Sequence, residues 1–200
     1  MRKFWNANTH YHGVVLAALP PGASRVLDAR CGDGVLLVEL VDAGVQHVVG
    51  IDADRGVLER ARTRFHSPSI EWLHGDVLQA DLALDSFDAV VSVAALHQMD
   101  AARALARFAQ LVRPGGVVTV IGLARADWWD IPLDAIAIAS RIGLSFIYGF
   151  WKHSAPQCWP PPLTYRDMKA LGPRVLPGAQ YRRHLLGRYS LIWRKPQEHA

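Results

Sequence analysis

The stretch Arg25-Val26-Leu27-Asp28-Ala29-Arg30-Cys31-Gly32-Asp33-Gly34 decides how this chain folds. Its first five residues predict a short buried strand, and the turn that follows leads into residues 35–41, whose apolar residues have helical spacing. Glycines in such a turn let the backbone approach a ligand closely, and the first turn of the helix leaves amides free for a carboxylate or phosphate. We therefore expect a strand-turn-helix unit that places Asp28, Gly32 and Gly34 at a binding site.

Strands and helices alternate on the C-terminal side of this unit. Helices are expected at residues 55–65 and 101–111, the second capped by Asp100, and the last two strands are expected to form an antiparallel hairpin through Gly187. This alternation predicts an α/β, doubly wound (Rossmann-like) fold with a mainly parallel sheet covered on both faces. The further strands are expected at residues 47–52, 70–74, 87–93, 117–121, 180–186 and 188–193.

The chain is predicted to form a single domain, residues 1–200. Residues 5–19 predict a helix that ends at Pro20-Pro21-Gly22, and Thr164 is expected to cap a short helix. The apolar segment after the fifth strand is too long for an ordinary connection, so it predicts an insertion that folds over the sheet edge. The expected parts are an N-terminal helix at 1–22, a cofactor-binding core at 24–122, a substrate lid at 124–163, and a closing helix and strands at 164–196.

The composition excludes several classes of protein. Half of the 200 residues are hydrophobic, which suffices for a core without disulfides, and the two cysteines lack the spacing of a zinc site. The net charge of +4 is spread along the chain, which predicts a solvated surface rather than a nucleic-acid site. The most apolar stretch, residues 133–151, contains Asp134 and Arg141, whose charges are costly inside a membrane. We expect a soluble, cytoplasmic protein, present as a monomer or homodimer, with no membrane or nucleic-acid partner.

Three more strand ends carry polar residues that suit one ligand. Asp52 follows Gly32 by twenty residues and can accept hydrogen bonds from both hydroxyls of a ribose. Asp76 can accept from an exocyclic amine, the Val77 amide can reach a ring nitrogen, and Ser92 ends the strand expected beneath the first turn. Because ligands of doubly wound sheets bind at the carboxyl ends of the strands, these positions predict a site for a nucleoside with a small charged group.

Two nucleotide-binding patterns are absent from this sequence. A dinucleotide fingerprint places a third glycine where this chain has Leu37, and no second mononucleotide half follows. The Gly-Lys-Ser/Thr of a phosphate-binding loop is missing as well. The ligand is therefore expected to be neither a dinucleotide nor a nucleoside triphosphate.

Residues 26–34 resemble the first motif of the class I S-adenosylmethionine-dependent methyltransferases. The later motifs of that family match in order, and the chain most resembles the small bacterial branch called methyltransferase type 11. The likeness covers residues 24–122, and residues 180–196 are similar to the two closing strands of the family's seven-stranded sheet. The matching segments are Gly50-Ile51-Asp52, His74-Gly75-Asp76, Phe87-Asp88-Ala89-Val90-Val91-Ser92 and Leu111-Val112-Arg113-Pro114-Gly115-Gly116.

The resemblance implies S-adenosylmethionine as the cofactor and gives each strand end a role. The first turn surrounds the methionine part, and the backbone carbonyl of Ser92 meets its amino group. An N-terminal helix covers the cofactor in many relatives, a role open here to Tyr11, His10 or His12. For the nucleoside, the implied contacts are Asp52 to the ribose, Ala53 against the adenine, and Asp76 and Val77 to the adenine edge.

Arg30 departs from the family pattern, which has glycine at that position. Its side chain could clash with the methionine tail, bond the cofactor's carboxylate, or turn to solvent. A guanidinium keeps its charge, and close approach to the positive sulfonium of the cofactor is unfavourable. Two functional hypotheses follow: a working methyltransferase that tolerates Arg30, and a non-catalytic or cofactor-impaired member of the same fold.

His97 is the candidate catalytic residue. It follows the fourth strand on the rim of the expected pocket, where it could act as a general base if the acceptor must lose a proton; a histidine bonded to a nearby loop is the alternative. The Trp128–Trp129 pair and the aromatic residues of 146–151 could line an acceptor pocket or form core. The sequence thus predicts methyl transfer to a small-molecule acceptor of apolar or aromatic character, with no metal.

Overall fold

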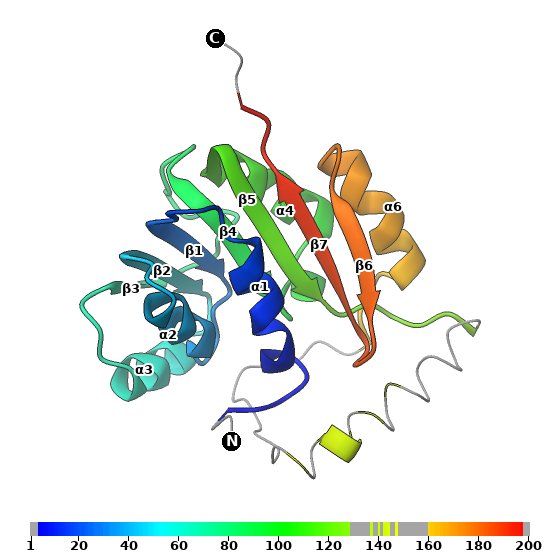
Figure 1. Ribbon diagram of the computed structural model, residues 1–200, viewed down its shortest axis with the longest axis horizontal. Coiled ribbons are helices and arrows are strands. Elements are labelled where there is room, and N and C mark those ends of the chain that lie inside the picture. The colour runs from blue at the N-terminus through cyan, green and yellow to red at the C-terminus, as the bar shows by residue number, and fades with distance from the viewer. Residues whose placement is uncertain are drawn as a thin grey trace.

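The computed structural model describes residues 4–128 and 160–197, together with residues 137, 140, 142–144 and 147. The strands form one seven-stranded sheet in the order β3-β2-β1-β4-β5-β7-β6 (Figure 1). The first five strands of that order are parallel, and β7 is antiparallel to both of its neighbours. The predicted fold class is confirmed. The strands are β1 (Arg25–Ala29), β2 (His47–Asp52), β3 (Ile70–His74), β4 (Phe87–Val93), β5 (Val112–Gly122), β6 (Gln180–His184) and β7 (Arg188–Arg194).

The order of the strands reverses at β1, which has β2 on one side and β4 on the other. The β1–β2 register extends to Ala29 opposite Ile51, whereas the β1–β4 register ends at Asp28 opposite Val91. The chain therefore leaves β1 and β4 in different directions, and the ends of these two strands border the crevice where a doubly wound sheet binds ligands.

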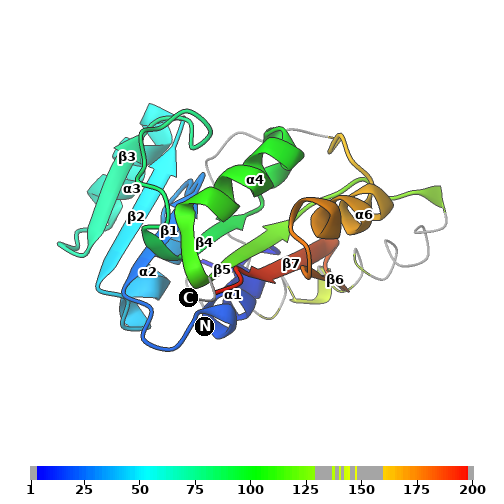
Figure 2. The same ribbon diagram turned by 90° about the horizontal axis from the view of Figure 1, so that it is seen from above.

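Helices cover both faces of the sheet (Figure 2). One face carries α1 (His12–Ala18), α2 (Val35–Asp42) and α3 (Arg55–Arg64), and the other carries α4 (Ala101–Leu111) and α6 (Tyr165–Val175). Carboxylates cap two of these helices: Asp54 accepts from the Val57 amide at 3.0 Å, and Asp100 accepts from the Arg103 amide at 3.0 Å. Thr164 and Asp167 form a capping box at the start of α6, so the predicted Thr164 cap is confirmed.

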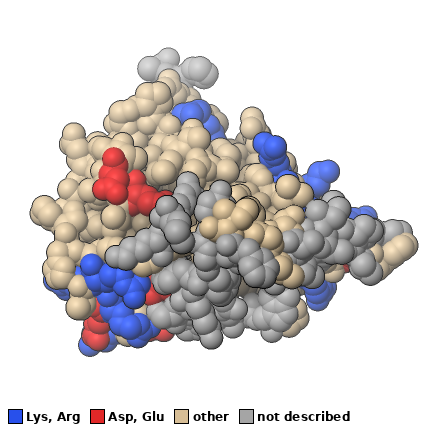
Figure 3. Space-filling model, turned by 60° about the horizontal axis from the view of Figure 1, so that its bottom comes forward, with Lys and Arg blue, Asp and Glu red and all other residues tan. Residues whose placement is uncertain are grey.

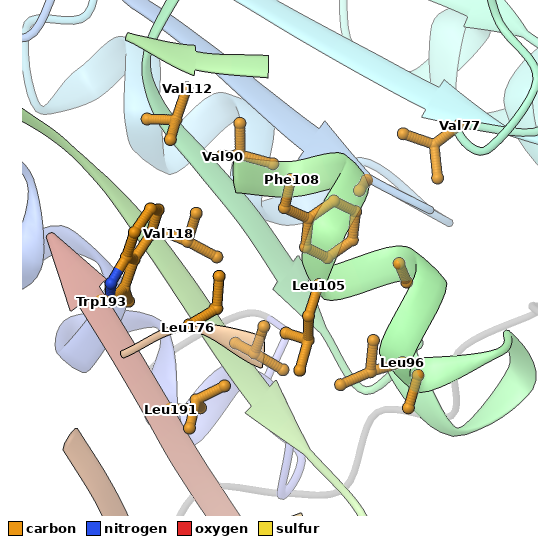
Figure 4. Packing of buried hydrophobic residues seen from close by; sticks show 14 of the residues in the cluster. Val77, Val90, Leu96, Leu105, Phe108, Val112, Val118, Leu176, Leu191 and Trp193 are labelled. Atoms are coloured by element: carbon orange, nitrogen blue, oxygen red, sulfur yellow. The ribbon is translucent and has the colours of Figure 1, made fainter. Parts of the chain in front are cut away.

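Two apolar layers hold the sheet and the helices together. On the side of α4 and α6, the fully buried Phe108 and Leu105 pack against strand residues and Trp193 (Figure 4). On the other face of the sheet, on the side of α1 and α2, the buried Leu37 and Leu40 belong to a separate cluster of apolar side chains. Truncating one of the large buried side chains, such as Phe108 to Ala, costs about 3–5 kcal/mol of stability. This packing fixes the positions of the strand ends that carry the candidate site.

One carboxylate ties the amino ends of β1 and β4 together. Asp88 accepts hydrogen bonds from the Ser24 amide at 2.7 Å and the Arg25 amide at 2.8 Å, and it pairs with Arg113. Burial alone would raise the pKa of Asp88, but these hydrogen bonds outweigh burial and lower the pKa below its ordinary value. The pair holds the sheet at the edge opposite to the candidate site.

The predicted N-terminal helix over residues 5–19 was wrong in its first half. The chain makes a turn first, then a 3-10 helix η1 (Thr9–Tyr11), and only then α1. Asn6 explains the delay, because its side-chain oxygen accepts from the amides of Asn8 at 2.8 Å and Thr9 at 3.0 Å. Such local side-chain bonds give the backbone an alternative to helix formation.

β5 is longer than predicted, because the expected turn at Pro114-Gly115-Gly116 is a bulge within the strand. Phe87 pairs with Val112, and the register then shifts so that Ala89 pairs with Val117. Gly115 takes a positive φ of 77° in this bulge. β6 in turn ends at His184, two residues earlier than predicted.

Among the described residues, no helix is long and apolar enough to cross a membrane. Most of the predicted lid, including Trp129 and Trp151, lies outside the residues that the structure describes. On the face shown in Figure 3, the described residues carry separate groups of both charges rather than one continuous basic stripe.

Candidate functional site

The turn after β1 is held against the end of β2. The Cys31 amide donates to the carbonyl of Ile51 at 3.0 Å, and the Gly32 amide donates to Oδ2 of Asp52 at 2.9 Å. Gly34 then starts α2 with a φ of +75°, and a Cβ at Gly34 would lie 2.4 Å from the Trp72 ring. Only glycine meets both demands, so the turn is fixed close to the backbone of β2.

Asp52 faces the turn from the end of β2, as predicted. Its Oδ1 accepts from the Asp54 amide at 2.9 Å and its Oδ2 accepts from Gly32, while the residue is only 5% exposed. Each carboxylate oxygen has capacity for a further hydrogen bond. The two backbone amides therefore orient a carboxylate that can still accept from a pair of hydroxyls.

Asp28 is the most unusual group of the site. It is 2% exposed, and its Oδ1 has no hydrogen-bond partner among the described residues. Burial, followed by the nearby charge of Asp52, raises the pKa of Asp28 to about 8. A buried carboxylate oxygen without a partner costs free energy, and a cationic or hydrogen-bonding ligand would remove that cost.

The segment after β3 contains the next predicted residues. Oδ1 of Asp76 accepts from the Leu78 amide at 3.0 Å, and the Val77 side chain is buried in the core rather than in the crevice. The carbonyl of Ala53 lies 3.2 Å from Nε2 of His74. These contacts place the predicted adenine-reading residues beside the end of β2.

Arg107 was not predicted, yet it supports this segment from below. Its Nη2 donates to the carbonyl of Ala80 at 2.9 Å and its Nε to that of Val77 at 3.4 Å. The sequence gives no signal for this role, because a lone arginine on a helix usually faces solvent. The arginine holds the loop after β3 against α4.

Ser92 lies beyond the last paired residues of β1 and β4. It is fully buried, and its hydroxyl donates to the carbonyl of Ala29 at 3.0 Å. That bond joins β4 to the start of the glycine turn. The serine side chain therefore supports the crevice, and its backbone lies at the position predicted for a ligand contact.

Two of the three described non-glycine residues with a positive φ lie at the same edge; the third, Asp85, precedes β4. Arg30 has a φ of 63° and Ala94 a φ of 55°, both in the left-handed region that favours glycine. The two residues follow β1 and β4, the strands that border the crevice. Non-glycine residues held in this region commonly cluster at binding sites.

Arg30 occupies the position where the family has glycine, and the positive φ explains that preference. Its side chain is partly exposed and makes no hydrogen bond or ion pair with the residues that the structure describes. It is close enough to His97 to affect that residue electrostatically.

His97 lies in the 3-10 helix η2 (Leu96–Gln98), directly after β4. Its Nδ1 is buried and has no hydrogen-bond partner in the described part of the chain. At that atom, the structure gives no support to the alternative in which His97 is bonded to a nearby loop. Burial, then the charges of Arg188 and Arg30, lower the pKa of His97 to about 4. The imidazole borders a small, mostly apolar pocket that is also lined by Leu96, Met99, Ala101, Leu123, Pro162, Leu163, Met168 and Tyr189.

The three N-terminal candidates have structural contacts. The Tyr11 hydroxyl accepts from the Leu186 amide at 3.1 Å, and its ring lies 4.7 Å from that of His184. His12 lies 2.9 Å from Glu39, which joins α1 to α2, and His10 packs edge-on against Tyr11. These contacts fix the N-terminal segment against the β6–β7 turn at the carboxyl edge of β5.

Comparisons with known proteins agree with this architecture. A family model described as a methyltransferase domain matches residues 26–116. An uncharacterized methyltransferase of Mycobacterium tuberculosis is 42% identical over 198 residues, which cover 96% of this chain and 98% of that protein. The 2-phytyl-1,4-naphtoquinone methyltransferase of Thermosynechococcus vestitus is 32% identical over 158 residues, 73% of this chain and 69% of that protein.

A solved structure has the same fold. The S-adenosylmethionine dependent methyltransferase from Mesorhizobium loti matches with a TM-score of 0.61 at 20% identity, over 91% of this chain and 96% of that chain. The aligned segments cover most of each relative named above and most of this chain. The chain therefore belongs to the methyltransferase family.

Proposed function

We propose that this protein transfers a methyl group from S-adenosylmethionine to a small acceptor of apolar or aromatic character. The observation that carries the proposal is the buried, unpartnered Oδ1 of Asp28 beside a turn that only glycine can form at Gly34. A charged amino-acid group next to a nucleoside suits this combination, because Asp52 offers oriented acceptors for a ribose. The residues present therefore fit the cofactor.

Each part of the cofactor has a candidate contact. Asp28, Gly32 and Gly34 would surround the methionine part, and the Ser92 carbonyl would accept from its amino group. Arg30 lies in the same turn, between Asp28 and Gly32. For the nucleoside, Asp52 would accept from the ribose hydroxyls, Ala53 would pack near the adenine, and Asp76 and the Val77 amide would meet its edge. Tyr11 would help to cover the cofactor.

The cofactor supplies a methyl group bound to a positive sulfur, which an acceptor atom displaces in line. The protein has to orient the acceptor and exclude water from it. The lining of the pocket beside His97 is mostly aliphatic or aromatic and would exclude water, and an acceptor would enter only if these side chains moved apart, because the pocket has room for roughly a water or two. Burial and two arginines lower the pKa of His97 to about 4, so its imidazole is neutral at pH 7 but a weak base, which suits orienting an acceptor by a hydrogen bond better than removing its proton.

Calorimetric titration with S-adenosylmethionine and with its demethylated product tests the proposal. We expect one site with micromolar affinity, as is usual for a cofactor held by several oriented hydrogen bonds. No heat at millimolar ligand would contradict it. The variant Arg30→Gly decides between the two hypotheses: if only this variant binds, Arg30 closes the site in the native chain and the protein is a non-catalytic member of the family.

A further inference from the structure

Arg107 joins α4 to the loop that follows β3. Its Nη2 donates to the carbonyl of Ala80 at 2.9 Å, and its Nε makes a longer hydrogen bond of 3.4 Å to the carbonyl of Val77. Both carbonyls belong to residues 76–80, the loop that contains the proposed contacts to the adenine edge. The helix that follows β4 therefore holds a loop that follows β3.

Residues 76–80 form a single turn that closes on Asp76. The carbonyl of Asp76 accepts from the amides of Gln79 at 2.9 Å and Ala80 at 2.8 Å, and its Oδ1 accepts from the Leu78 amide at 3.0 Å. One isolated turn is marginal in water, because few hydrogen bonds offset the ordering of its backbone. Contacts from outside the turn must therefore keep it in place.

Two such contacts come from α4 and the core beside it. The Val77 side chain is 1% exposed and lies in the same apolar cluster as Phe108, the chain neighbour of Arg107 (Figure 4). Arg107, itself partly buried, adds the two carbonyl contacts, and the planar, fixed set of donors on a guanidinium suits such a pair. The Val77 side chain anchors the turn in the core, and Arg107 sets the direction of its carbonyls.

The turn presents one acceptor and one donor. Oδ2 of Asp76 and the amide of Val77 make no hydrogen bond to any residue that the structure describes. A carboxylate accepts and a backbone amide donates. Adenine offers the matching pair, an exocyclic amine that donates next to a ring nitrogen that accepts, whereas hypoxanthine offers an oxygen that accepts next to an N–H that donates. The turn therefore suits adenine and opposes hypoxanthine.

We propose that Arg107 is a positioning residue for base recognition: by holding the turn at residues 76–80, it lets Asp76 and Val77 select an adenine over a hypoxanthine. This rests on the proposed function, because the base is part of the same cofactor. The guanidinium acts on the base only through the two carbonyls. Polar groups that are left unmatched weaken binding more than a lost apolar contact does, so the orientation of the turn controls specificity.

The demethylated cofactor and its hypoxanthine analogue are suitable probes, since they differ only at this edge of the base. Each is titrated calorimetrically into the full chain. We expect the native protein to prefer the adenine form by about 30-fold or more, because the analogue loses two hydrogen bonds, one of them to a carboxylate. Equal affinities for the two probes would overturn the inference.

Arg107→Met is the decisive variant, because methionine keeps an unbranched stem and a good helix propensity but has no N–H donor. The adenine form should bind about 5- to 10-fold more weakly, the loss expected for about one hydrogen bond, and the analogue should change by less than about twofold. Arg107→Lys keeps a donor and should restore part of the preference. Arg103→Met, one turn earlier on the exposed side of α4, is the matched control and should behave as the native protein.

A purely structural role for Arg107 would give a different result. General loosening of the fold would weaken both probes to the same extent, and that outcome overturns the inference. In the Asp76→Asn background, which lacks the carboxylate, Arg107→Met should lose much of its effect on the adenine form, because residues that act together are not additive. Full additivity of the two changes would show that Arg107 does not act through the turn.

Amide hydrogen exchange at residues 76–80 gives a second readout, in the protein without ligand. Exchange there should be faster in Arg107→Met than in Arg103→Met, and equal exchange would overturn the inference. If Arg107→Met fails to fold, Arg107→Lys takes its place in both experiments, with a smaller effect expected. A native protein that binds neither probe contradicts the proposed function and the inference with it, whereas one that binds the adenine form without selecting it contradicts the inference alone.

Discussion

The two halves of the carboxyl edge differ in charge and in how their charges are held. On the side of β1 to β3, Asp28 and Asp52 are almost fully buried, and Asp52 is oriented by two backbone amides. On the side of β4 to β7, Arg30 and His97 are only partly buried, and both have polar atoms without hydrogen bonds to described residues. We call these the acidic half and the basic half.

This difference indicates that the side chains of the acidic half are held in one arrangement that suits one ligand. Fewer hydrogen bonds hold the side chains of the basic half in place. Oriented, desolvated groups recognise a fixed pattern of donors and charge, as a cofactor presents. Partly solvated groups beside an apolar pocket fix fewer features of a ligand. The boundary falls within β1 and its turn, since the buried acid Asp28 and the cationic Arg30 are two residues apart.

Asp52→Ala should break the acidic half and give the largest effect. It removes both acceptors for the ribose, and hydrogen bonds to a charged group contribute about 1.5–3 kcal/mol each, so we expect cofactor affinity to fall by roughly 10²- to 10⁴-fold. Calorimetry measures the change, and Asp42→Ala, at the exposed end of α2, is the control. A loss below threefold would show that the ribose lies elsewhere.

Asp28→Asn, also in the acidic half, should change the Tm of the free protein and the affinity for the cofactor, two effects that are measured separately. The pKa of Asp28 in the folded protein is about 8, above its ordinary value of 3.8, so its contribution to the free energy of unfolding decreases as the pH rises from 4 to 8. The variant cannot ionise and should therefore raise the Tm of the free protein at pH 8 but not at pH 4.

The same variant should weaken the cofactor about tenfold, because an ammonium group loses its counter-charge. In the native protein, binding should release a proton below pH 8, so the affinity should increase with pH up to that point. Calorimetry in buffers of different ionisation enthalpy measures the proton. An unchanged Tm together with unchanged affinity would show that Asp28 is ionised and satisfied in the free protein.

Arg30→Gly should have the smallest effect on stability and sharpens the boundary between the halves. Glycine adopts the φ of 63° without strain but makes the unfolded chain more flexible, so the net gain is about 0.5–1 kcal/mol, or about 2 °C in Tm. Thermal unfolding of the two proteins at equal pH measures it. A lower Tm for the variant would indicate that the arginine side chain stabilises the fold through contacts.

The fold could be predicted from the sequence because its strands are short apolar runs bounded by glycine, proline or acidic residues. The first four strands have the predicted bounds: β2 and β3 end at the polar residues Asp52 and His74, and β1 and β4 end just before residues with a positive φ. The helix over residues 5–19 failed because the amides of Asn8 and Thr9 bond to a side chain, and helical periodicity does not register such bonds.

The candidate site was predictable only in part. The positions of Asp28, Asp52 and Asp76 follow from parallel strand order, but their protonation depends on burial and on neighbours from other strands. The hydrogen bonds of Arg107 join segments that are distant in the sequence. The pocket beside His97 is likewise lined by residues from distant segments, such as Met168 and Tyr189. No local pattern records such contacts, so they required the three-dimensional structure.

The way the chain forms the pocket beside His97 also bears on how this fold evolves. The acidic half is encoded by one continuous stretch, from β1 to the segment after β3, whereas much of the pocket wall comes from residues after β5, including Leu163 and Tyr189. A recombination event near residue 123 between two relatives would exchange that wall in a single step and leave the acidic half intact. If the pocket receives the proposed methyl acceptor, inheritance of a whole C-terminal segment would change the acceptor and keep the cofactor contacts.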